Sequence, residues 1–506
     1  MRAALERLSP WIAIAAVVAF HASFAERDRA LFLDQRYYVH FAQRIADGAV
    51  PHRDLFDNKP ELASVLAAPA VLAGDRLGID RVRAVRLASV ATAAATGLAA
   101  AALAATVHRS RIASALAALC WTSAPLLGFQ PSVGPVPKLW MTLLAIVSGL
   151  LAARRRWFAA GAVAAAAALD WQVGALAGIG VLAAAALERE RPVRAAAAVA
   201  AGGVATTAVV AAALARAGAL RPALEQTVLA TLVRGSGSVA RRGAEARLEQ
   251  VASWMRESGA APAWLAVAGL AGVLGTLLAL GRLRGRPSLP ALLPATVLGT
   301  GVLGLTLLDF QGYGDLFVVV AFLATFAGLA AGALERLLRR VEPRDGLGAA
   351  VLLAMLALAA HPWSPSPLAL EERLWPAGVD LDVQRRVARE LADLARGRTL
   401  GFAGCSEQLS LSGVPNAFSF PFWNRATWGN FRRDASEPSG KALLRIASER
   451  KVDGVVCAPD EASDELAAAG WTRRVLAAPP TRYQVDVFLR PDADPTADPA
   501  AAPSPR

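Results

Sequence analysis

The chain has 506 residues, of which 55% are hydrophobic, and a formal net charge of +12. Its mean hydropathy of +0.40 excludes an ordinary soluble protein of this size and places the chain in the membrane class. The positive charge does not indicate nucleic acid as a partner, because the arginines are concentrated in short loops between apolar runs.

Ten apolar runs follow one another, and several reach the length of about 20 residues that crosses a bilayer core. They cover residues 11–26, 86–107, 112–128, 139–153, 157–187, 195–215, 261–281, 288–308, 316–334 and 346–362. The run 157–187 is long for one crossing and Asp170 interrupts it, so we expect two short helices that turn at Asp170-Trp171-Gln172. Residues 62–73 predict a partial or re-entrant helix, which gives about 11–13 helices in all.

Arginines gather in the connections around 108–111, 154–156, 189–194, 282–286 and 336–340. This distribution predicts that these connections face the cytoplasm. Residues 27–61, which we call the first loop, then fall on the opposite side. So do residues 219–259, whose mixed charges and helical period predict an amphipathic segment on the membrane surface.

We expect a transmembrane domain over residues 1–363, an extracytoplasmic α/β domain over 364–490 (the tail domain) and a disordered end over 491–506. Within the tail domain, 398–404, 452–458 and 483–489 read as strands, and 383–396 and 442–449 as helices. Cys405 and Cys457 each follow a strand, and a disulfide between them is one alternative in an oxidising compartment. The predicted fold class is an all-α polytopic membrane protein with a small C-terminal α/β domain.

The first loop concentrates charge in a chain that is otherwise mostly apolar. Asp34 precedes a predicted helix over 35–46, and Asp54, Asp57 and Lys59 follow that helix. Charged groups held near lipid are costly and mark functional sites. Two interpretations of Asp34 are open: an N-cap of the helix, or a carboxylate held at the membrane–water boundary as a general base.

The cluster at residues 52–60 also has two interpretations. It is either a solvated loop or a phosphate site in which Arg53 and Lys59 supply the cations. In the second interpretation, Asp54 and Asp57 orient the lysine or hold a divalent cation such as Mg²⁺ or Mn²⁺. Five histidines in the chain, without a zinc-type spacing, make a zinc site a poor interpretation.

The stretch that begins Asp-Gln-Arg-Tyr-Tyr at residue 34, followed by Ala-Asp-Gly-Ala-Val-Pro-His-Arg-Asp-Leu-Phe-Asp-Asn-Lys-Pro up to residue 60, resembles the first extracytoplasmic loop of bacterial polytopic glycosyltransferases. This is the family 39 group, which is similar to dolichyl-phosphate-mannose protein mannosyltransferases and to the aminoarabinose transferases of lipid A. Its pattern is an acidic pair, an aromatic residue, G-x-P-Y-R-D and then D-x-K-P-P. The resemblance covers the first loop closely and the remaining spans loosely.

The resemblance implies a helical GT-C fold in the bacterial inner membrane. It implies inverting transfer of a sugar from a polyprenyl-phosphate donor to a periplasmic glycan, lipid or protein acceptor. Asp34 matches the family's proposed base and Lys59 the lysine that contacts the donor phosphate, with Tyr37 as the adjacent aromatic residue.

The chain departs from this pattern at three places. Gln35 stands where a second acid is common, and Glu61 where a second proline is common. Lys138 follows Pro137 where many members carry Thr-Glu, so it is either a further contact to phosphate or a basic anchor at a helix end.

Further polar residues lie at predicted extracytoplasmic helix ends and are candidates for the rim of the same cavity; capping of those ends is the alternative. They are Asp170, Gln172, Asp309, Tyr313 and Asp315.

Two other functions remain open. A transporter or flippase would place ionisable residues or broken helices near the middle of the bilayer, whereas the polar residues here gather on one side. A non-catalytic relative that binds the carrier lipid is favoured by Gln35 and Glu61.

Overall fold

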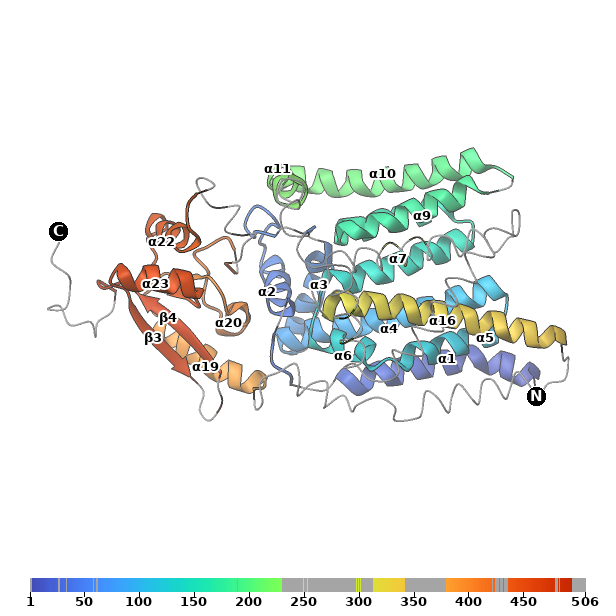
Figure 1. Cartoon of the computed structure of the whole chain (residues 1–506), viewed down its shortest axis with the longest axis horizontal. Coiled ribbons are helices and arrows are strands. Elements are labelled where there is room, and N and C mark those ends of the chain that lie inside the picture. Colours follow the sequence, from blue (N-terminus) through green and yellow to red (C-terminus); the bar gives the residue numbers. More distant parts are fainter. Residues whose placement is uncertain are drawn as a thin grey trace.

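The computed structural model (Figure 1) describes residues 2–229, 313–341 and 379–493, together with isolated positions between 249 and 301. Gaps within these ranges are at 26–27, 33, 58, 61, 189, 421, 424–426, 428–430, 432–435, 478–480 and 482. In this part of the chain, four helices are long and apolar enough to cross a membrane. They are Glu6–Ala25 within α1 (Arg2–Ala25), α4 (Arg81–His108), α10 (Pro192–Arg216) and Asp315–Glu335 within α16 (Tyr313–Val341).

Shorter apolar helices complete the described part of the bundle. Helices α5 (Arg111–Thr122) and α6 (Pro125–Val133) meet at 65°. They are followed by α7 (Pro137–Ala153), α8 (Trp157–Asp170) and α9 (Ala175–Ala186), with the 3₁₀ turn η1 (Gln172–Gly174) between the last two. The predicted break after Asp170 is therefore confirmed.

Small residues allow the outermost described helices to pack closely. A Cβ atom built on Gly161 of α8 would lie 2.1 Å from the carbonyl oxygen of Val199, and one on Gly202 of α10 would lie 2.0 Å from that of Phe158. The two helices are thus in backbone contact, as is common where glycine and alanine line helix interfaces in membranes.

Helices α2 (Gln35–Ala46) and α3 (Leu62–Leu77) lie between the end of α1 and the start of α4. Val39, Val71 and Val85, one from each of α2, α3 and α4, are buried in one cluster. The Arg86 guanidinium near the start of α4 donates to the carbonyl oxygens of Val133 (2.9 Å) and Arg29 (2.5 Å). These bonds place the end of α1 and the start of α4 at one end of the bundle. Helix α3, which connects the first loop to α4, therefore has both of its ends on that side, as predicted for a partial helix.

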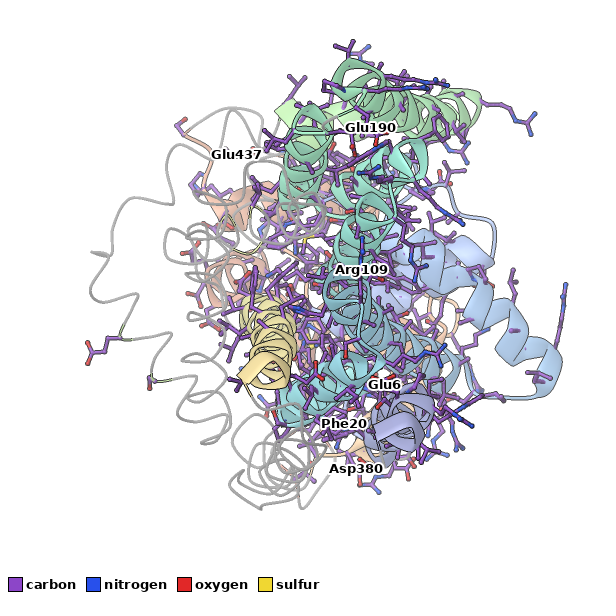
Figure 2. All side chains as sticks on the ribbon, turned by 90° about the vertical axis from the view of Figure 1, so that its right-hand side faces the viewer. Glu6, Phe20, Arg109, Glu190, Asp380 and Glu437 are labelled. Carbon is purple, nitrogen blue, oxygen red and sulfur yellow. A yellow bond between two sulfur atoms is a disulfide. The ribbon has the colours of Figure 1, made fainter. Side chains whose placement is uncertain are left out.

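The described arginine-rich connections, at 108–111, 154–156 and 190–194, lie at the other end of the bundle. Arg155 between α7 and α8 pairs with Glu188 (3.3 Å) and Glu190 (3.8 Å) between α9 and α10. Ser110 between α4 and α5 donates to Glu335 near the end of α16 (3.4 Å). Figure 2 views the bundle from this end, with Arg109 and Glu190 labelled.

The tail domain lies beyond the opposite end (Figure 1). Its helices are α19 (Leu381–Leu394), α20 (Ser406–Ser412), α22 (Ser439–Glu449) and α23 (Asp460–Ala468). Its strands are β1 (Leu400–Phe402), β2 (Gly454–Val456), β3 (Thr472–Ala477) and β4 (Gln484–Leu489). The sheet order is β1-β2-β4-β3; the pair β1–β2 is parallel and the other two pairs are antiparallel.

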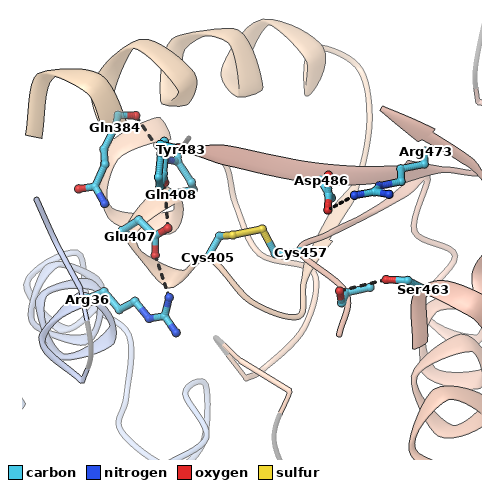
Figure 3. Close-up of a disulfide and its surroundings, with 11 residues drawn as sticks. Arg36, Gln384, Cys405, Glu407, Gln408, Cys457, Ser463, Arg473, Tyr483 and Asp486 are labelled. Carbon is cyan, nitrogen blue, oxygen red and sulfur yellow. Dashed lines mark hydrogen bonds and ion pairs between the residues drawn. A yellow bond between two sulfur atoms is a disulfide. The ribbon is translucent and has the colours of Figure 1, made fainter. Parts of the chain in front are cut away.

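The predicted strands and helices of the tail domain are confirmed, whereas α20, α23 and β3 were not predicted. Cys405 and Cys457 form a disulfide that joins the start of α20 to the end of β2 (Figure 3). Within the predicted surface segment 219–259, the structure describes residues 219–229 and the isolated positions 249 and 253. Residues 219–229 connect to α10 and contain α11 (Leu220–Leu224) and the π-helical turn η2 (Glu225–Leu229).

The tail domain is bound to the first loop by specific contacts. The Arg36 guanidinium of α2 pairs with the buried Glu407 carboxylate of α20 (3.4 Å), which also accepts a hydrogen bond from Tyr483 (2.8 Å; Figure 3). The Gln384 carboxamide exchanges two hydrogen bonds with the backbone of Leu31 (2.7 and 3.0 Å). The tail domain therefore fixes the helix that follows Asp34.

Candidate functional site

Asp34 occupies the N-cap position of α2, but its carboxylate makes no capping hydrogen bond to the helix. The carboxylate instead accepts a hydrogen bond from the Tyr37 hydroxyl, one turn along α2. Its second oxygen lies 3.6 Å from the Lys59 Nζ atom. The capping interpretation of the side chain is thus wrong, and the structure brings together Asp34 and Lys59 across the first loop.

This ion pair is open to solvent. The Asp34 side chain is 51% exposed and that of Lys59 is 21% exposed. A pair of this kind contributes less than about 1 kcal/mol. The Lys59 ammonium also lies 5.7 Å from the ring centre of Tyr38, whose face attracts a cation. An anion of higher charge can therefore replace Asp34 as the partner of Lys59 at a small cost in free energy.

The pKa of Asp34 reflects two opposed effects. The surrounding protein acts to raise it, because the charged form is partly desolvated. The ammonium of Lys59, the hydrogen bond from Tyr37 and the charge of Lys138 act in the other direction and together outweigh burial. The pKa of Asp34 is lowered below its usual value, so the group is a carboxylate at neutral pH.

Asp57 stands in a different environment. Its side chain is buried, and its Oδ1 atom accepts a hydrogen bond from the backbone N–H of Lys59 (3.0 Å). Burial is the main cause that raises the pKa of Asp57 to about 6, against the opposing charges of Lys59 and His52. Two carboxyl groups near one lysine therefore differ in pKa, which is typical of functional sites.

Lys138, at the start of α7, forms a tighter pair. Its Nζ atom lies 2.7 Å from Asp315 of α16, and the two side chains are only 10% and 8% exposed. The ammonium also lies 4.8 Å from the ring centre of Trp171. This buried pair joins α7 to α16 and already neutralises the Lys138 charge, which favours the anchor interpretation of Lys138 over a contact to phosphate.

Three residues of the predicted phosphate site do not reach Asp34 in the described part of the chain. Arg53 pairs with Asp54 (2.9 Å) and donates to the carbonyl oxygen of Ala217 (3.0 Å). Gln35 is buried against Gly134, and a Cβ atom built on that glycine would lie 3.2 Å from the Cβ atom of Gln35. The turn at 51–54 and the start of α2 direct these side chains away from the Asp34–Lys59 pair, and the phosphate-binding role of Arg53 and the supporting roles of Asp54 and Gln35 stay predictions.

The predicted rim residues have different fates. Asp315 joins Lys138, and Gln172 donates to the carbonyl oxygen of Thr227 (3.4 Å). Asp170 is fully buried at the end of α8, so its carboxyl does not face an open rim as predicted. Asp309 and the side chain of Tyr313 lie outside the described residues.

Several neighbours of the site were not predicted from the sequence. The ring of Phe422 in the tail domain lies 4.8 Å from that of Tyr37. Gln226 of η2 binds the backbone of the first loop. Both contacts join residues that are far apart in the sequence, which makes them hard to predict. The aromatic composition of 418–423 is a signal for the Phe422 contact.

The predicted divalent cation finds no ligand set in the described residues. No group of three or more His, Cys, Asp or Glu side chains comes together there. The Asp34 carboxylate is paired with Lys59, and the pKa of Asp57 is raised, so neither carboxyl group is a ready ligand for a cation. These residues do not fit a metal centre.

The bundle and tail domain share their fold with solved membrane-protein structures, which confirms the predicted GT-C fold. No family model and no curated protein sequence matches the chain. Solved structures do match. ArnT from Cupriavidus metallidurans in the apo state has a TM-score of 0.59 at 13% identity, over 95% of this chain and 98% of that one.

Two further structures share the fold. ArnT bound to undecaprenyl phosphate has a TM-score of 0.57 at 12% identity, over 98% of this chain and 99% of that one. The Archaeoglobus fulgidus oligosaccharyltransferase complex with Zn and sulfate has a TM-score of 0.53 at 13% identity, over 89% of this chain and 67% of that one. At such identities the likeness concerns the fold.

Proposed function

We propose that the chain is a membrane glycosyltransferase that moves a sugar from a polyprenyl-phosphate donor to an acceptor, with inversion at the anomeric carbon. The observation that carries this proposal is the open Asp34–Lys59 pair at one end of a GT-C-like bundle. The binding of undecaprenyl phosphate by ArnT, which shares the fold, supports a lipid phosphate as the ligand.

Lys59 is the proposed ligand of the donor phosphate. In the reaction, an acceptor hydroxyl oxygen forms a bond to the anomeric carbon while the bond from that carbon to the phosphate oxygen breaks. The electron pair leaves with the polyprenyl phosphate, where negative charge grows. A lysine beside that oxygen stabilises the transition state more than the ground state, because the charge is larger there.

Asp34 is the proposed base that receives the proton of the acceptor hydroxyl. Its carboxylate is present at neutral pH because the cation of Lys59 helps to lower its pKa. When Lys59 moves to the donor phosphate, Asp34 loses part of this stabilisation and its proton affinity rises. Binding of the donor thus makes the base stronger at the moment when it is needed.

The orientation follows from charge. The arginine-rich connections occupy one end of the bundle, and Asp34, Lys59 and the tail domain occupy the other. By the positive-inside rule the arginine-rich end faces the cytoplasm. The proposed site then lies on the outer face of a bacterial inner membrane, where a lipid-linked sugar and a periplasmic glycan, lipid or protein can meet.

The test compares Asp34→Asn and Lys59→Ala in cells that lack the native protein and as purified protein with undecaprenyl phosphate. We expect Asp34→Asn to abolish the wild-type glycan profile yet retain lipid binding, and Lys59→Ala to weaken lipid binding. Asp47→Asn, at the other end of α2 in an exposed pair with Arg81, and Lys441→Ala, at an exposed position of α22, are matched controls.

Two outcomes would contradict this assignment. If both site variants keep the glycan profile, Asp34 and Lys59 are not the machinery. If the wild-type protein binds the lipid but Asp34→Asn changes nothing in the cell, a non-catalytic lipid-binding protein becomes the better interpretation.

A further inference from the structure

Gln226 connects the first loop to a part of the chain that is distant in sequence. It lies in η2, the π-helical turn that follows α11. Its Oε1 atom lies 2.9 Å from Nδ1 of His52 and accepts a hydrogen bond from the backbone N–H of Asp57 (3.2 Å). Its Nε2 atom donates to the carbonyl oxygen of His52 (2.9 Å). One carboxamide therefore holds both ends of the segment 52–57.

The segment needs such support. His52 has a φ of +62°, a left-handed conformation that is uncommon for a residue with a side chain. Within the adjoining turn, the N–H of Arg53 donates to the carbonyl oxygen of Pro51 (2.8 Å) and the N–H of Asp54 to that of Val50 (2.9 Å). Beyond that turn, the N–H of Phe56 is bound by Ser419 of the tail domain (2.8 Å), and the N–H of Asp57 is bound by Gln226.

Lys59 follows this anchored segment by two residues. Its own backbone N–H donates to Asp57, so the position of Asp57 sets the position of the lysine. A shift of the Asp57 backbone would move the Lys59 ammonium away from Asp34, 3.6 Å from it in this structure. π-Helical turns are rare and are frequent at functional sites, and η2 places the Gln226 carboxamide against this segment.

We propose that Gln226 is a positioning residue of the donor site, which acts through Asp57 to hold Lys59 where the donor phosphate binds. The proposal rests on the function proposed above. A carboxamide suits this role because it donates and accepts at the same time. A carboxylate at this place could accept from Asp57 but could not donate to His52.

The experiment uses the full-length protein in lipid nanodiscs with Gln226→Ala, the isosteric Gln226→Glu, and Glu225→Gln as control. Glu225 is the neighbouring residue and pairs with Arg221 at the exposed surface. Hydrogen–deuterium exchange of the peptide over residues 50–60 reports the anchoring itself. Binding of undecaprenyl phosphate, and KM against kcat in a glycosylation assay, report the role in donor binding.

We expect Gln226→Ala to accelerate exchange at the Asp57 amide. Gln226→Glu keeps the acceptor for that amide but loses the bond to the His52 carbonyl oxygen, so it should accelerate exchange over residues 50–60 to a smaller extent. We expect both variants to weaken lipid-phosphate binding, raise KM and lower kcat/KM by about tenfold, the equivalent of about one hydrogen bond, with the control like wild type. Should Gln226→Ala fail to fold, Gln226→Glu still tests lipid binding, KM and exchange of the 50–60 peptide.

Unchanged exchange would overturn the anchoring. Faster exchange with unchanged lipid binding and KM would overturn the positioning role and leave the proposed function intact. A wild-type protein that neither binds the lipid nor transfers a sugar would instead refute the proposed function, whatever the exchange shows.

Discussion

Replacing Asp57 by asparagine removes a buried titratable group from the first loop but keeps an acceptor for the backbone N–H of Lys59. Burial raises the pKa of Asp57 to about 6 from an ordinary value of 3.8. The folded protein therefore binds a proton more tightly at this position than the unfolded chain does. The variant should change how the stability of the protein depends on pH.

The size of the effect follows from the two pKa values. Their difference of about 2 pKa units corresponds to ~3 kcal/mol at 1.36 kcal/mol per unit. Because the folded pKa is the higher one, the stabilising proton is fully present below pH 3.8 and is lost as the pH rises through about 6. Relative to wild type, Asp57→Asn should gain up to ~3 kcal/mol at pH 7–8 and close to nothing near pH 4.

Thermal unfolding in nanodiscs between pH 4 and pH 8 measures this difference. The apparent melting temperatures of wild type and Asp57→Asn should approach each other near pH 4, separate between pH 4 and pH 6, and differ by a nearly constant amount above pH 6. Asp47→Asn, which alters an exposed ion pair between the end of α2 and Arg81 of α4, serves as control. A constant gap across the pH range, or a gap that grows toward low pH, would refute the reasoning.

Three further predictions concern the bundle and the tail domain. Lys138→Met should cost about 3–5 kcal/mol, because the buried Asp315 carboxylate loses its lysine, and adding Asp315→Asn should recover most of this loss in unfolding experiments. The double variant Cys405→Ser/Cys457→Ser opens a loop with a sequence separation of 52 residues. It should cost the tail domain ~4 kcal/mol by the chain-entropy relation, measured by its denaturant midpoint; an unchanged midpoint would contradict a structural role. Gly202→Val should separate α8 from α10 and lower the yield of folded protein. Gly203→Val should be tolerated better, because a Cβ atom built on Gly203 lies 3.8 Å from the carbonyl oxygen of Gly161.

Much of the fold was predictable because the bilayer imposes strict rules on the sequence. Apolar length located the described spans, and the polar Asp170-Trp171-Gln172 marked a real break between α8 and α9. The predicted spans 261–281, 288–308 and 346–362 lie outside the described helices. In the tail domain, α20 and α23 escaped prediction because they are short and have mixed composition.

The candidate site was predictable where its residues share one loop. Asp34 and Lys59 lie 25 positions apart, and a turn between two helices can bring them together. Charge alone did not reveal that Asp54 is the ion-pair partner of Arg53, because the sequence does not show which way a turn directs its side chains. The aromatic composition of 418–423 signalled Phe422 without its partner Tyr37, and nothing signalled Gln226, since contacts over such separations depend on the packing of the whole bundle and tail domain.

The most direct test of the account is an experimental structure of the protein in a lipid nanodisc with added undecaprenyl phosphate. We expect the phosphate to contact the Lys59 ammonium, with the Lys138–Asp315 pair retained and the Asp34 carboxylate freed from the lysine. A phosphate bound at the arginine-rich end of the bundle, or one that leaves the Asp34–Lys59 pair undisturbed, would contradict the account.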